Sequence, residues 1–274
     1  MGVSVLRAFV SHESYTVTGH AKGFTIMVTV IGIDCAAQEK GVGLARAVWD
    51  GRRTKVTDLA KGGHGLPVVE IVREWIRDST TTLLALDAPL GWPKPFGPQL
   101  VHHMAGLPLP IPANLMFRRE TDRHIRALAC KQSLDVGADR IARTAHGALA
   151  LLGSLAKALH RPIGLAWGMA VTPGVNAIEV YPAATLKMLN WPSSGYKKKE
   201  QRPVRQEILT KLKEEIALPS DTSMAADDAD VLDAIVCVLA GQDFLAGKAQ
   251  PPDQELMDCV KKEGWIWVRG SQAV

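Results

Sequence analysis

The sequence predicts an α/β fold in which a mixed sheet, with three antiparallel strands followed by parallel strands, is flanked by helices. Two apolar runs, at residues 28–34 and 82–87, each end in an aspartate and have the composition of buried central strands. Between them lie two shorter runs joined by Asp50-Gly51, a dipeptide that favours a tight hairpin turn. A helical pattern then precedes the second apolar run, which gives the order β-β-β-α-β.

The first half of the sheet can be assigned run by run. Residues 28–34 form the first expected strand, and residues 43–49 and 52–58 form the two strands of the hairpin. Residues 67–76 carry valine, isoleucine and tryptophan at helical spacing, and Pro67 suits the first turn of a helix. After this helix, residues 82–87 are expected to return parallel to the first strand.

A helical insertion is expected after the second apolar run. Residues 88–113 contain seven prolines, so this stretch is predicted to be a long surface loop. Residues 118–130 and 138–159 have helical patterns and complete an inserted helical layer over about residues 88–160. The remaining elements are expected to be a strand at residues 175–181, helices at 203–216 and 227–245, and a short terminal strand at 265–268.

The length of 274 residues and the hydrophobic content of 47% suit one large domain, which is expected to span residues 27–270. Residues 1–26 lack the continuous hydrophobic stretch and cleavage site of a secretion signal, and they are expected to form a flexible N-terminal extension. The apolar stretches fall well short of the roughly 18 to 20 residues that a bilayer span requires, so no membrane partner is expected. These features favour a cytoplasmic protein.

Cysteine spacing and net charge narrow the functional classes. The four cysteines are far apart and form no Cys-x-x-Cys pair, which argues against a zinc or disulfide-exchange site and favours a reduced protein. The formal net charge of +4 permits a polyanionic partner such as nucleic acid without requiring one. A homodimer stays open, because the sequence does not reveal the oligomeric state.

Acidic residues stand where two central strands end and along one side of the last long helix. Asp34 and Asp87 end their strands, and in open α/β sheets ligands bind in the crevice beyond the strand ends. In the helix at 227–245, Asp230 and Asp233 are three residues apart on a side that otherwise carries small residues, so this side can approach the sheet closely. Carboxylates gathered at one point repel one another unless cations lie among them, and hard oxygen ligands suit Mg²⁺ or Mn²⁺.

Such a cluster predicts hydrolytic chemistry. Two ions about 4 Å apart can activate a water molecule and stabilise the leaving oxygen of a phosphodiester. We therefore expect a hydrolase of the nuclease class that acts on DNA or RNA. For any one of these acids taken alone, the stronger interpretation is structural, because aspartates at strand ends cap turns and acids in a first helical turn complement the helix dipole.

Six segments give the chain a specific resemblance over about residues 30–268. They are IGIDCA, LALDAPLGWP, FRRETDR, IEVYPAATLK, DADVLDAI and EGWIWV. In this order they resemble domain-of-unknown-function family 429, which implies a ribonuclease-H-like fold and nuclease activity. The Asp-x-x-Asp-Ala of the last helix is similar to that of Holliday-junction resolvases.

The resemblance also implies a ligand set. Asp34 and Asp87 are the implied metal ligands of the first and fourth strands, and Asp230 and Asp233 are those of the helix. Resolvases carry a glutamate on the fourth strand, where this chain has the shorter carboxylate of Asp87. A shorter side chain at this position is expected to alter the spacing of bound metal ions.

Several charged residues admit both a binding and a structural role. Glu179 either joins the metal ligands or stands at the entry of the helix that Pro182 introduces. The segment FRRETDR either grips a nucleic-acid backbone with guanidinium groups or forms a solvated helix with internal ion pairs. The run YKKKEQRPVR either forms a flexible nucleic-acid clamp, with Tyr196 stacking on a base, or is a solvated loop. The candidate nucleic-acid-binding residues are Arg118, Arg119, Arg123, Lys197, Lys198, Lys199, Arg202 and Arg205.

Two alternatives to a nuclease stay open. The same fold class includes nucleotide-binding ATPases and sugar kinases, in which the first strand and hairpin hold the phosphates of ATP. Such proteins need a second glycine-rich phosphate loop after a strand, and neither Gly62-Gly63 nor a later glycine pair is expected in that position. A non-catalytic scaffold that binds a partner through its proline-rich loop and basic run is the other alternative, and it predicts that the acids do not cluster.

Overall fold

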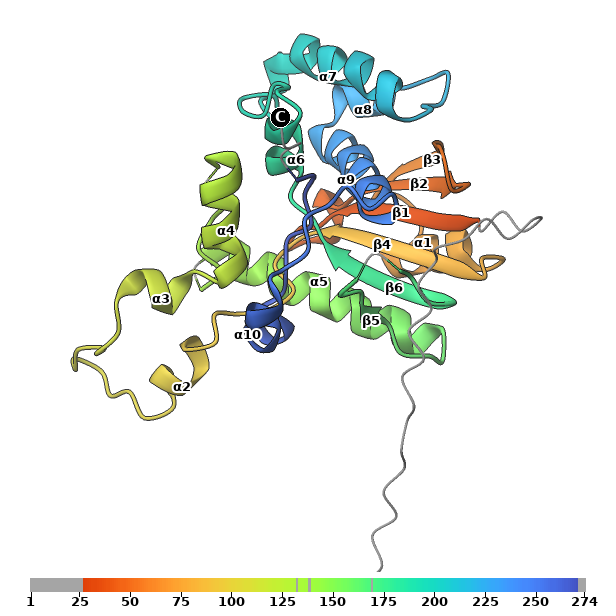
Figure 1. The fold of residues 1–274 in the computed structure, drawn as a ribbon. Coiled ribbons are helices and arrows are strands. Elements are labelled where there is room, and N and C mark those ends of the chain that lie inside the picture. Colours follow the sequence, from red (N-terminus) through yellow and green to blue (C-terminus); the bar gives the residue numbers. More distant parts are fainter. Residues whose placement is uncertain (1–26, 132, 138, 169, 271–274) are drawn as a thin grey trace, which may run out of the picture.

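A six-stranded mixed sheet with the order β3-β2-β1-β4-β6-β5 forms the centre of the described part of the chain, residues 27–131, 133–137, 139–168 and 170–270. In this computed structural model, β1 (Val28–Asp34), β2 (Gly43–Trp49) and β3 (Thr54–Lys61) are antiparallel neighbours. β4 (Thr81–Asp87), β6 (Gly174–Glu179) and β5 (Gly164–Leu165) continue the sheet in parallel pairs. The predicted mixed sheet is confirmed and is consistent with a ribonuclease-H-like arrangement (Figure 1). The extension expected at residues 1–26 lies outside the described residues.

The strands alternate their side chains between two buried faces. Along β1, Val28 and Val30 contribute to the core on one face, whereas Ile31 and Ile33 contribute to the core on the other. Strands that are buried on both faces carry continuous apolar runs, which explains the sequences VTVIGI in β1 and TTLLAL in β4.

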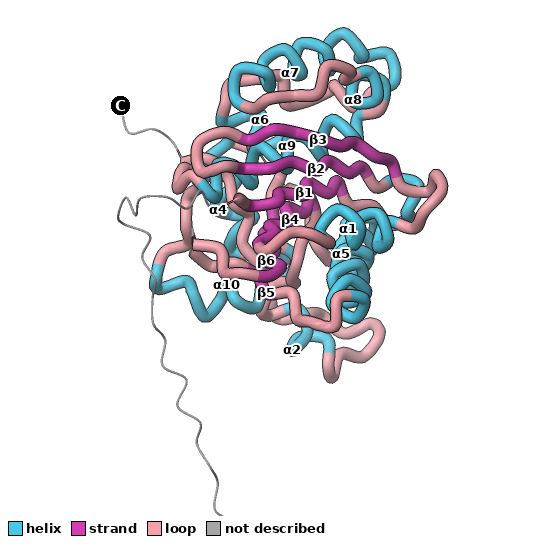
Figure 2. Tube along the Cα trace, turned by 90° about the vertical axis from the view of Figure 1, so that its right-hand side faces the viewer, coloured by secondary structure: helices cyan, strands magenta, loops and turns pink. Residues whose placement is uncertain are grey.

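Two helices cover one face of the sheet, α1 (Val68–Ile76) and α5 (Asp139–Ala158) (Figure 2). α1 buries Val68, Val72 and Ile76 at helical spacing. α5 buries Leu152 and Leu155 in the same core, so this helix of the predicted insertion belongs to the main core of the protein.

The opposite face is covered by α9 (Ala229–Leu245), which is buried along almost its whole length. α6 (Pro182–Met188), α7 (Arg202–Glu215) and α8 (Ser223–Asp227) pack against it. The helix predicted at residues 227–245 is confirmed as α9, but it begins after Asp228, whose carboxylate accepts hydrogen bonds from the N–H groups of Asp230 (2.8 Å) and Val231 (3.4 Å). This N-cap fixes where α9 begins.

The remaining helices and turns lie outside these two layers or connect them. They are α2 (Phe96–Leu100), α3 (Ala113–Phe117), α4 (Glu120–Ala129) and α10 (Met257–Glu263), with the 3-10 turns η1 (Glu39–Gly41), η2 (Lys199–Gln201) and η3 (Gln254–Leu256). The predicted loop at 88–113 is mostly irregular, although it holds the short α2 and the first residue of α3.

The C-terminal segment does not form the strand predicted at residues 265–268. Ile266 makes a single bridge with Glu179, and Arg269 makes a single bridge with Ala249. Trp267 packs its ring against Phe244 of α9, with ring centroids 4.7 Å apart. Because packing on a helix buries the same apolar residues that a strand would bury, the local sequence does not distinguish the two.

α9 approaches β1 so closely that a glycine is required at position 32. A Cβ atom at Gly32 would lie 2.0 Å from the carbonyl oxygen of Ala234 and 2.9 Å from the backbone nitrogen of Val238. We expect Gly32→Ala to lower the free energy of unfolding by about 1–3 kcal/mol, because two backbones must move apart. Gly153→Ala in α5, where the added Cβ meets open space, is expected to raise it by about 0.5–1 kcal/mol. Urea denaturation measures both variants, and a neutral Gly32→Ala would contradict this close packing.

Candidate metal centre

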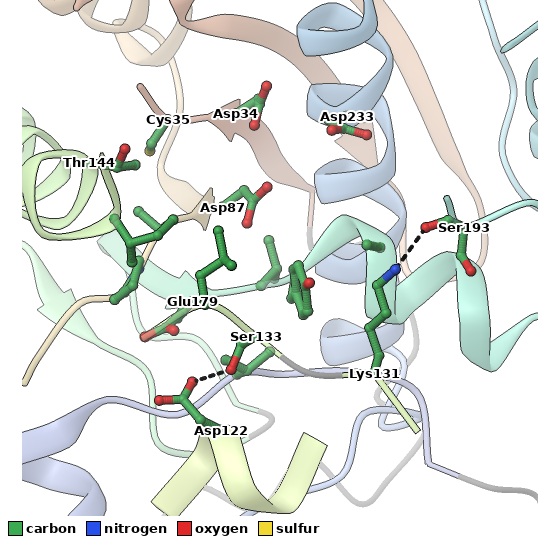
Figure 3. Close-up of a pocket in the computed structure, with 18 of the residues that line it drawn as sticks. Asp34, Cys35, Asp87, Asp122, Lys131, Ser133, Thr144, Glu179, Ser193 and Asp233 are labelled. Atoms are coloured by element: carbon green, nitrogen blue, oxygen red, sulfur yellow. Dashed lines mark hydrogen bonds between the residues drawn. The ribbon is translucent and has the colours of Figure 1, made fainter. Parts of the chain in front are cut away.

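β1 and β4 end side by side, and the last residue of each strand is an aspartate. Asp34 and Asp87 are paired in register across the two parallel strands. Gly32 and Ala85, two residues earlier, both face α9, so the alternation of side chains turns the two aspartates toward the same helix. α9 adds Asp233, and carboxylate oxygens of the three residues lie within 4.8 Å of one another (Figure 3). The predicted convergence of the two strand-end acids is confirmed.

Burial raises the pKa of each carboxyl group in this cluster. Asp34 is 6% exposed and Asp233 is 0% exposed. Burial, followed by the charge of Asp233, raises the pKa of Asp34 well above its usual range. Burial raises the pKa of Asp87 to about 7 and also raises that of Asp233, although the ammonium of Lys197 acts in the opposite direction on both. Protons or cations therefore offset the charge that the three side chains share.

The raised pKa of Asp87 predicts a pH-dependent stability of the metal-free protein. The carboxyl group titrates near pH 3.9 in the unfolded chain, but its pKa is about 7 in the folded protein. Stability that is present below about pH 4 is therefore lost as the pH rises to about 7, by at most about 1.4 kcal/mol per pH unit for this one group. We expect the stability of Asp87→Asn to fall less between pH 4 and pH 7, because asparagine does not titrate. Urea denaturation in EDTA between pH 4 and 7 compares the two proteins, and parallel stability profiles would contradict the raised pKa.

Two residues of the run YKKKEQRPVR contact the carboxylate of Asp233. The Tyr196 hydroxyl donates a hydrogen bond to Oδ1 of Asp233 at 2.8 Å, and the ammonium of Lys197 lies 2.5 Å from Oδ2. The stacking role predicted for Tyr196 is wrong, because its side chain is only 2% exposed. Sequence reasoning also missed Lys197 as a residue of the acidic cluster, since nothing in the local sequence separates it from the two lysines that follow.

Asp230 lies outside the cluster of three aspartates. Its carboxylate forms an ion pair with Lys61 of β3, which also contacts Asp228 at 3.0 Å. The carbonyl group of Asp230 lies directly over Gly43 of β2. Asp233 lies only about 60° around the helix from Asp230 but about 4.5 Å further along its axis, where it meets Asp34 and Asp87 at the ends of β1 and β4. The structure therefore gathers three of the four acids that the resemblance implies as ligands.

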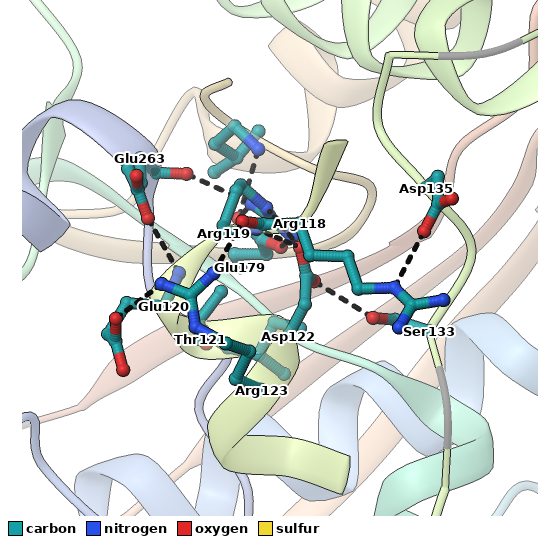
Figure 4. A network of polar contacts seen from close by, with 12 residues as sticks. Arg118, Arg119, Glu120, Thr121, Asp122, Arg123, Ser133, Asp135, Glu179 and Glu263 are labelled. Atoms are coloured by element: carbon teal, nitrogen blue, oxygen red, sulfur yellow. Dashed lines mark hydrogen bonds and ion pairs between the residues drawn. The ribbon is translucent and has the colours of Figure 1, made fainter. Parts of the chain in front are cut away.

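Glu179 also lies apart from the three aspartates, in a buried network around Arg119 (Figure 4). It is paired in register with Leu86 rather than Asp87, so alternation turns it toward the other face of the sheet. The guanidinium of Arg119 donates to Oε1 and Oε2 of Glu179 at 2.7 and 2.9 Å and to Oδ1 of Asp122 at 2.9 Å. Arg119 is only 1% exposed. The nucleic-acid contact predicted for Arg119 is therefore wrong, because its guanidinium is enclosed with two carboxylates of its own chain.

Arg205 has a structural role as well. It is 2% exposed and donates hydrogen bonds to the carbonyl groups of Tyr196 (2.6 Å), Lys198 (2.8 Å) and Ala226 (2.7 Å). The nucleic-acid contact predicted for Arg205 is wrong, because its guanidinium is buried and bound to these carbonyl groups. Its guanidinium instead fastens the loop that carries Lys197.

The other predicted nucleic-acid-binding residues lie nearer the surface. Arg118 pairs with Asp135 at 2.9 Å and Arg123 pairs with Glu120 at 2.5 Å, which are internal ion pairs of the kind that the structural alternative required. Three further side chains are exposed: Lys198, Lys199 and Arg202. The last of these pairs with Asp227 at 2.5 Å.

A cavity of about 510 Å³ opens beside the three aspartates. Thr144 of α5 lines it across from Asp233 (Figure 3), and Tyr181 and Lys197 also line it. On another side, the ammonium of Lys131 donates to the carbonyl group of Ser193 at 3.2 Å. A volume of this order suits a small ligand or one unit of a longer polymer.

Among the described residues, no helix combines the length and the apolar character needed to cross a bilayer. Cys35, Cys130, Cys237 and Cys259 are all free thiols.

The model of the family described as "Protein of unknown function (DUF429)" matches residues 32–256. The match begins in β1 and ends with η3, so it includes all three aspartates of the cluster. No curated protein matches the chain. The resemblance to this family is confirmed over the matched residues, whereas the sixth segment, EGWIWV, lies beyond them.

Proposed function

Since the chain belongs to the DUF429 family of proteins of unknown function, we propose its activity from its own residues: it is a metal-dependent nuclease that hydrolyses phosphodiester bonds of nucleic acid. One observation carries this proposal. Carboxylate oxygens of Asp34, Asp87 and Asp233 lie within 4.8 Å of one another in the wall of a cavity. Like charges that share so small a volume call for a bound cation.

The donor set suits a hard divalent cation. Asp34, Asp87 and Asp233 offer carboxylate oxygens, the ligands that Mg²⁺ and Mn²⁺ prefer, and these three residues would hold the ion. A cation in this position supplies the positive charge that stabilises a phosphoryl group during hydrolysis. Tyr196 orients Asp233 through its hydrogen bond to Oδ1, and Lys197 brings a further positive charge to the same carboxylate.

The surface next to the cavity favours a polyanionic substrate. Lys197 lines the cavity, and Lys198, Lys199 and Arg202 follow it in the chain with exposed side chains. A nucleic-acid backbone that lies along this run brings one phosphate to the aspartates. The formal net charge of +4 is compatible with such a partner.

The two alternatives fit the contacts less well. Contrary to the sequence expectation, Gly62 directly follows β3, as a phosphate loop requires. Its position is closed, however, because a Cβ at Gly62 would lie 2.1 Å from the carbonyl oxygen of Glu39. The carboxylate of Glu39 also accepts the N–H of Val68 at the start of α1, where a phosphate would bind. The scaffold alternative requires dispersed acids, whereas three of the four predicted acids meet.

Cation binding and a substrate panel test the proposal. Isothermal titration measures Mn²⁺ binding to the metal-free protein. Cleavage is followed on single-stranded, duplex and branched DNA and RNA with Mg²⁺ or Mn²⁺, and EDTA provides the control. We expect cation-dependent cleavage of at least one nucleic acid. Mn²⁺ binding without cleavage of any of them would contradict a nuclease, and the absence of Mn²⁺ binding would remove the metal centre itself.

A further inference from the structure

Lys197 reaches the aspartate cluster from the surface of the protein. Its side chain is 53% exposed, yet its ammonium nitrogen lies 2.5 Å from Oδ2 of Asp233, whose side chain is 0% exposed. Burial acts to lower the pKa of Lys197, but the charges of Asp233, Asp34 and Asp87 raise it above its usual value. The ammonium therefore acts as a counter-ion for the cluster as a whole.

The backbone is held by hydrogen bonds on both sides of Lys197, whereas the side chain of Lys197 is free to change its conformation. The buried guanidinium of Arg205 holds the carbonyl groups of Tyr196 and Lys198 at 2.6 and 2.8 Å. The same guanidinium is anchored to the carbonyl group of Ala226 in α8 at 2.7 Å. A lysine side chain has a flexible four-carbon stem. The ammonium can therefore move between Asp233 and the cavity without any movement of the backbone.

The ammonium and a divalent cation compete for the same oxygen. Oδ1 of Asp233 accepts the Tyr196 hydroxyl, and Oδ2 pairs with Lys197. A cation shared with Asp34 and Asp87 takes its third ligand from this carboxylate, and two positive charges on one buried oxygen repel strongly. The cation must therefore displace the ammonium, which then lies free at the wall of the cavity that Lys197 lines.

We propose that Lys197 is a displaceable counter-ion that becomes a substrate-binding residue. In the metal-free protein its ammonium offsets part of the negative charge of the cluster, and when a divalent cation binds, the ammonium moves into the cavity and binds a phosphate group of the substrate. The displacement depends only on cation binding at the cluster, whereas the phosphate contact rests on the proposed function. A phosphate monoester or diester is the chemical class that such an ammonium binds.

Lys197→Met tests both steps, because methionine keeps the length of the side chain and removes its charge. Isothermal titration at pH 8.5, where protons compete weakly, should give a Mn²⁺ dissociation constant about tenfold lower than that of the parent protein. At saturating Mn²⁺ the KM for a nucleic-acid substrate should rise about tenfold. Lys197→Arg keeps the charge and should stay near the parent in both measurements. Lys198→Met removes the charge of the next, exposed lysine and should leave Mn²⁺ affinity within about twofold of the parent.

The outcomes of these measurements distinguish displacement of the ammonium from its contact with phosphate. Unchanged or weaker Mn²⁺ binding by Lys197→Met, in a variant that melts at the temperature of the parent, overturns the displacement. Tighter Mn²⁺ binding with an unchanged KM supports the displacement and overturns the phosphate contact. Absence of Mn²⁺ binding in both parent and variant overturns the metal centre of the proposed function, and the inference with it.

Discussion

Replacement of Asp34 by asparagine will lower Mn²⁺-dependent hydrolysis of nucleic acid by about 100- to 1000-fold. Asparagine has nearly the same shape, but it replaces a charged oxygen ligand with a neutral one. In the metal-free protein the same change should raise the melting temperature, because burial and the neighbouring charge of Asp233 already disfavour an ionised Asp34. Initial rates at saturating Mn²⁺ and thermal melts in EDTA measure the two effects.

Asp230→Asn is the matched control. Asp230 is also an aspartate that the family resemblance implies as a ligand, but its carboxylate pairs with Lys61 outside the cluster. We expect this variant to lose less than about tenfold in rate, through the altered charge near the site. An equal loss in both variants would contradict a three-aspartate centre and would restore the four-ligand set.

The strands that the sequence predicts well are those buried on both faces. β1, β2 and β4 were expected at residues 28–34, 43–49 and 82–87 and differ from the structure by at most one residue. β5 has only two residues, Gly164 and Leu165, so no periodicity can reveal it. The segment at 265–268 has the composition of a strand, but its tryptophans pack on helices and loops. Whether such a segment forms a strand depends on pairing partners that are distant in the chain.

The acidic site was predictable to the extent that strand geometry determines it. Parallel neighbours end at the same edge of a sheet, so Asp34 and Asp87 had to meet. Asp230 and Asp233 could not be separated in the same way, because both stand on the side of α9 that carries small residues. Which of them reaches the strand ends depends on how α9 packs on the sheet, with the carbonyl group of Asp230 over Gly43 and that of Ala234 over Gly32.

The basic residues were the least predictable part of the site. Arg118 and Arg119 are neighbours in one charged segment, yet the first is partly exposed and the second is buried. The difference comes from Glu179, which is 60 residues away in the chain and pairs with Arg119 alone of the two. Local composition describes the charge of a segment, but only tertiary contacts decide which guanidinium groups face solvent.

Arg119→Met will lower the free energy of unfolding by about 3–5 kcal/mol. The Asp122 and Glu179 side chains beside this arginine are 1% and 3% exposed, so both carboxylates would stay buried without their counter-charge. Arg119 also donates to the carbonyl group of Glu263 at 3.0 Å, which ties α4 to α10. The cost should shrink as the pH falls, because protonation neutralises the carboxyl groups that the arginine leaves behind. Urea denaturation at pH 5 and pH 8 measures the effect and its pH dependence.

Arg118→Met provides the comparison within the same segment. Arg118 forms an ion pair with Asp135, but the two side chains are 24% and 39% exposed, so water screens the loss of the charge. A pair of this kind contributes at most about 1 kcal/mol. If Arg118→Met were as destabilising as Arg119→Met, the destabilisation would come from charge removal in this segment generally. A large difference between them would instead assign Arg119 the role of holding α4, the end of β6 and α10 together beside the aspartate cluster.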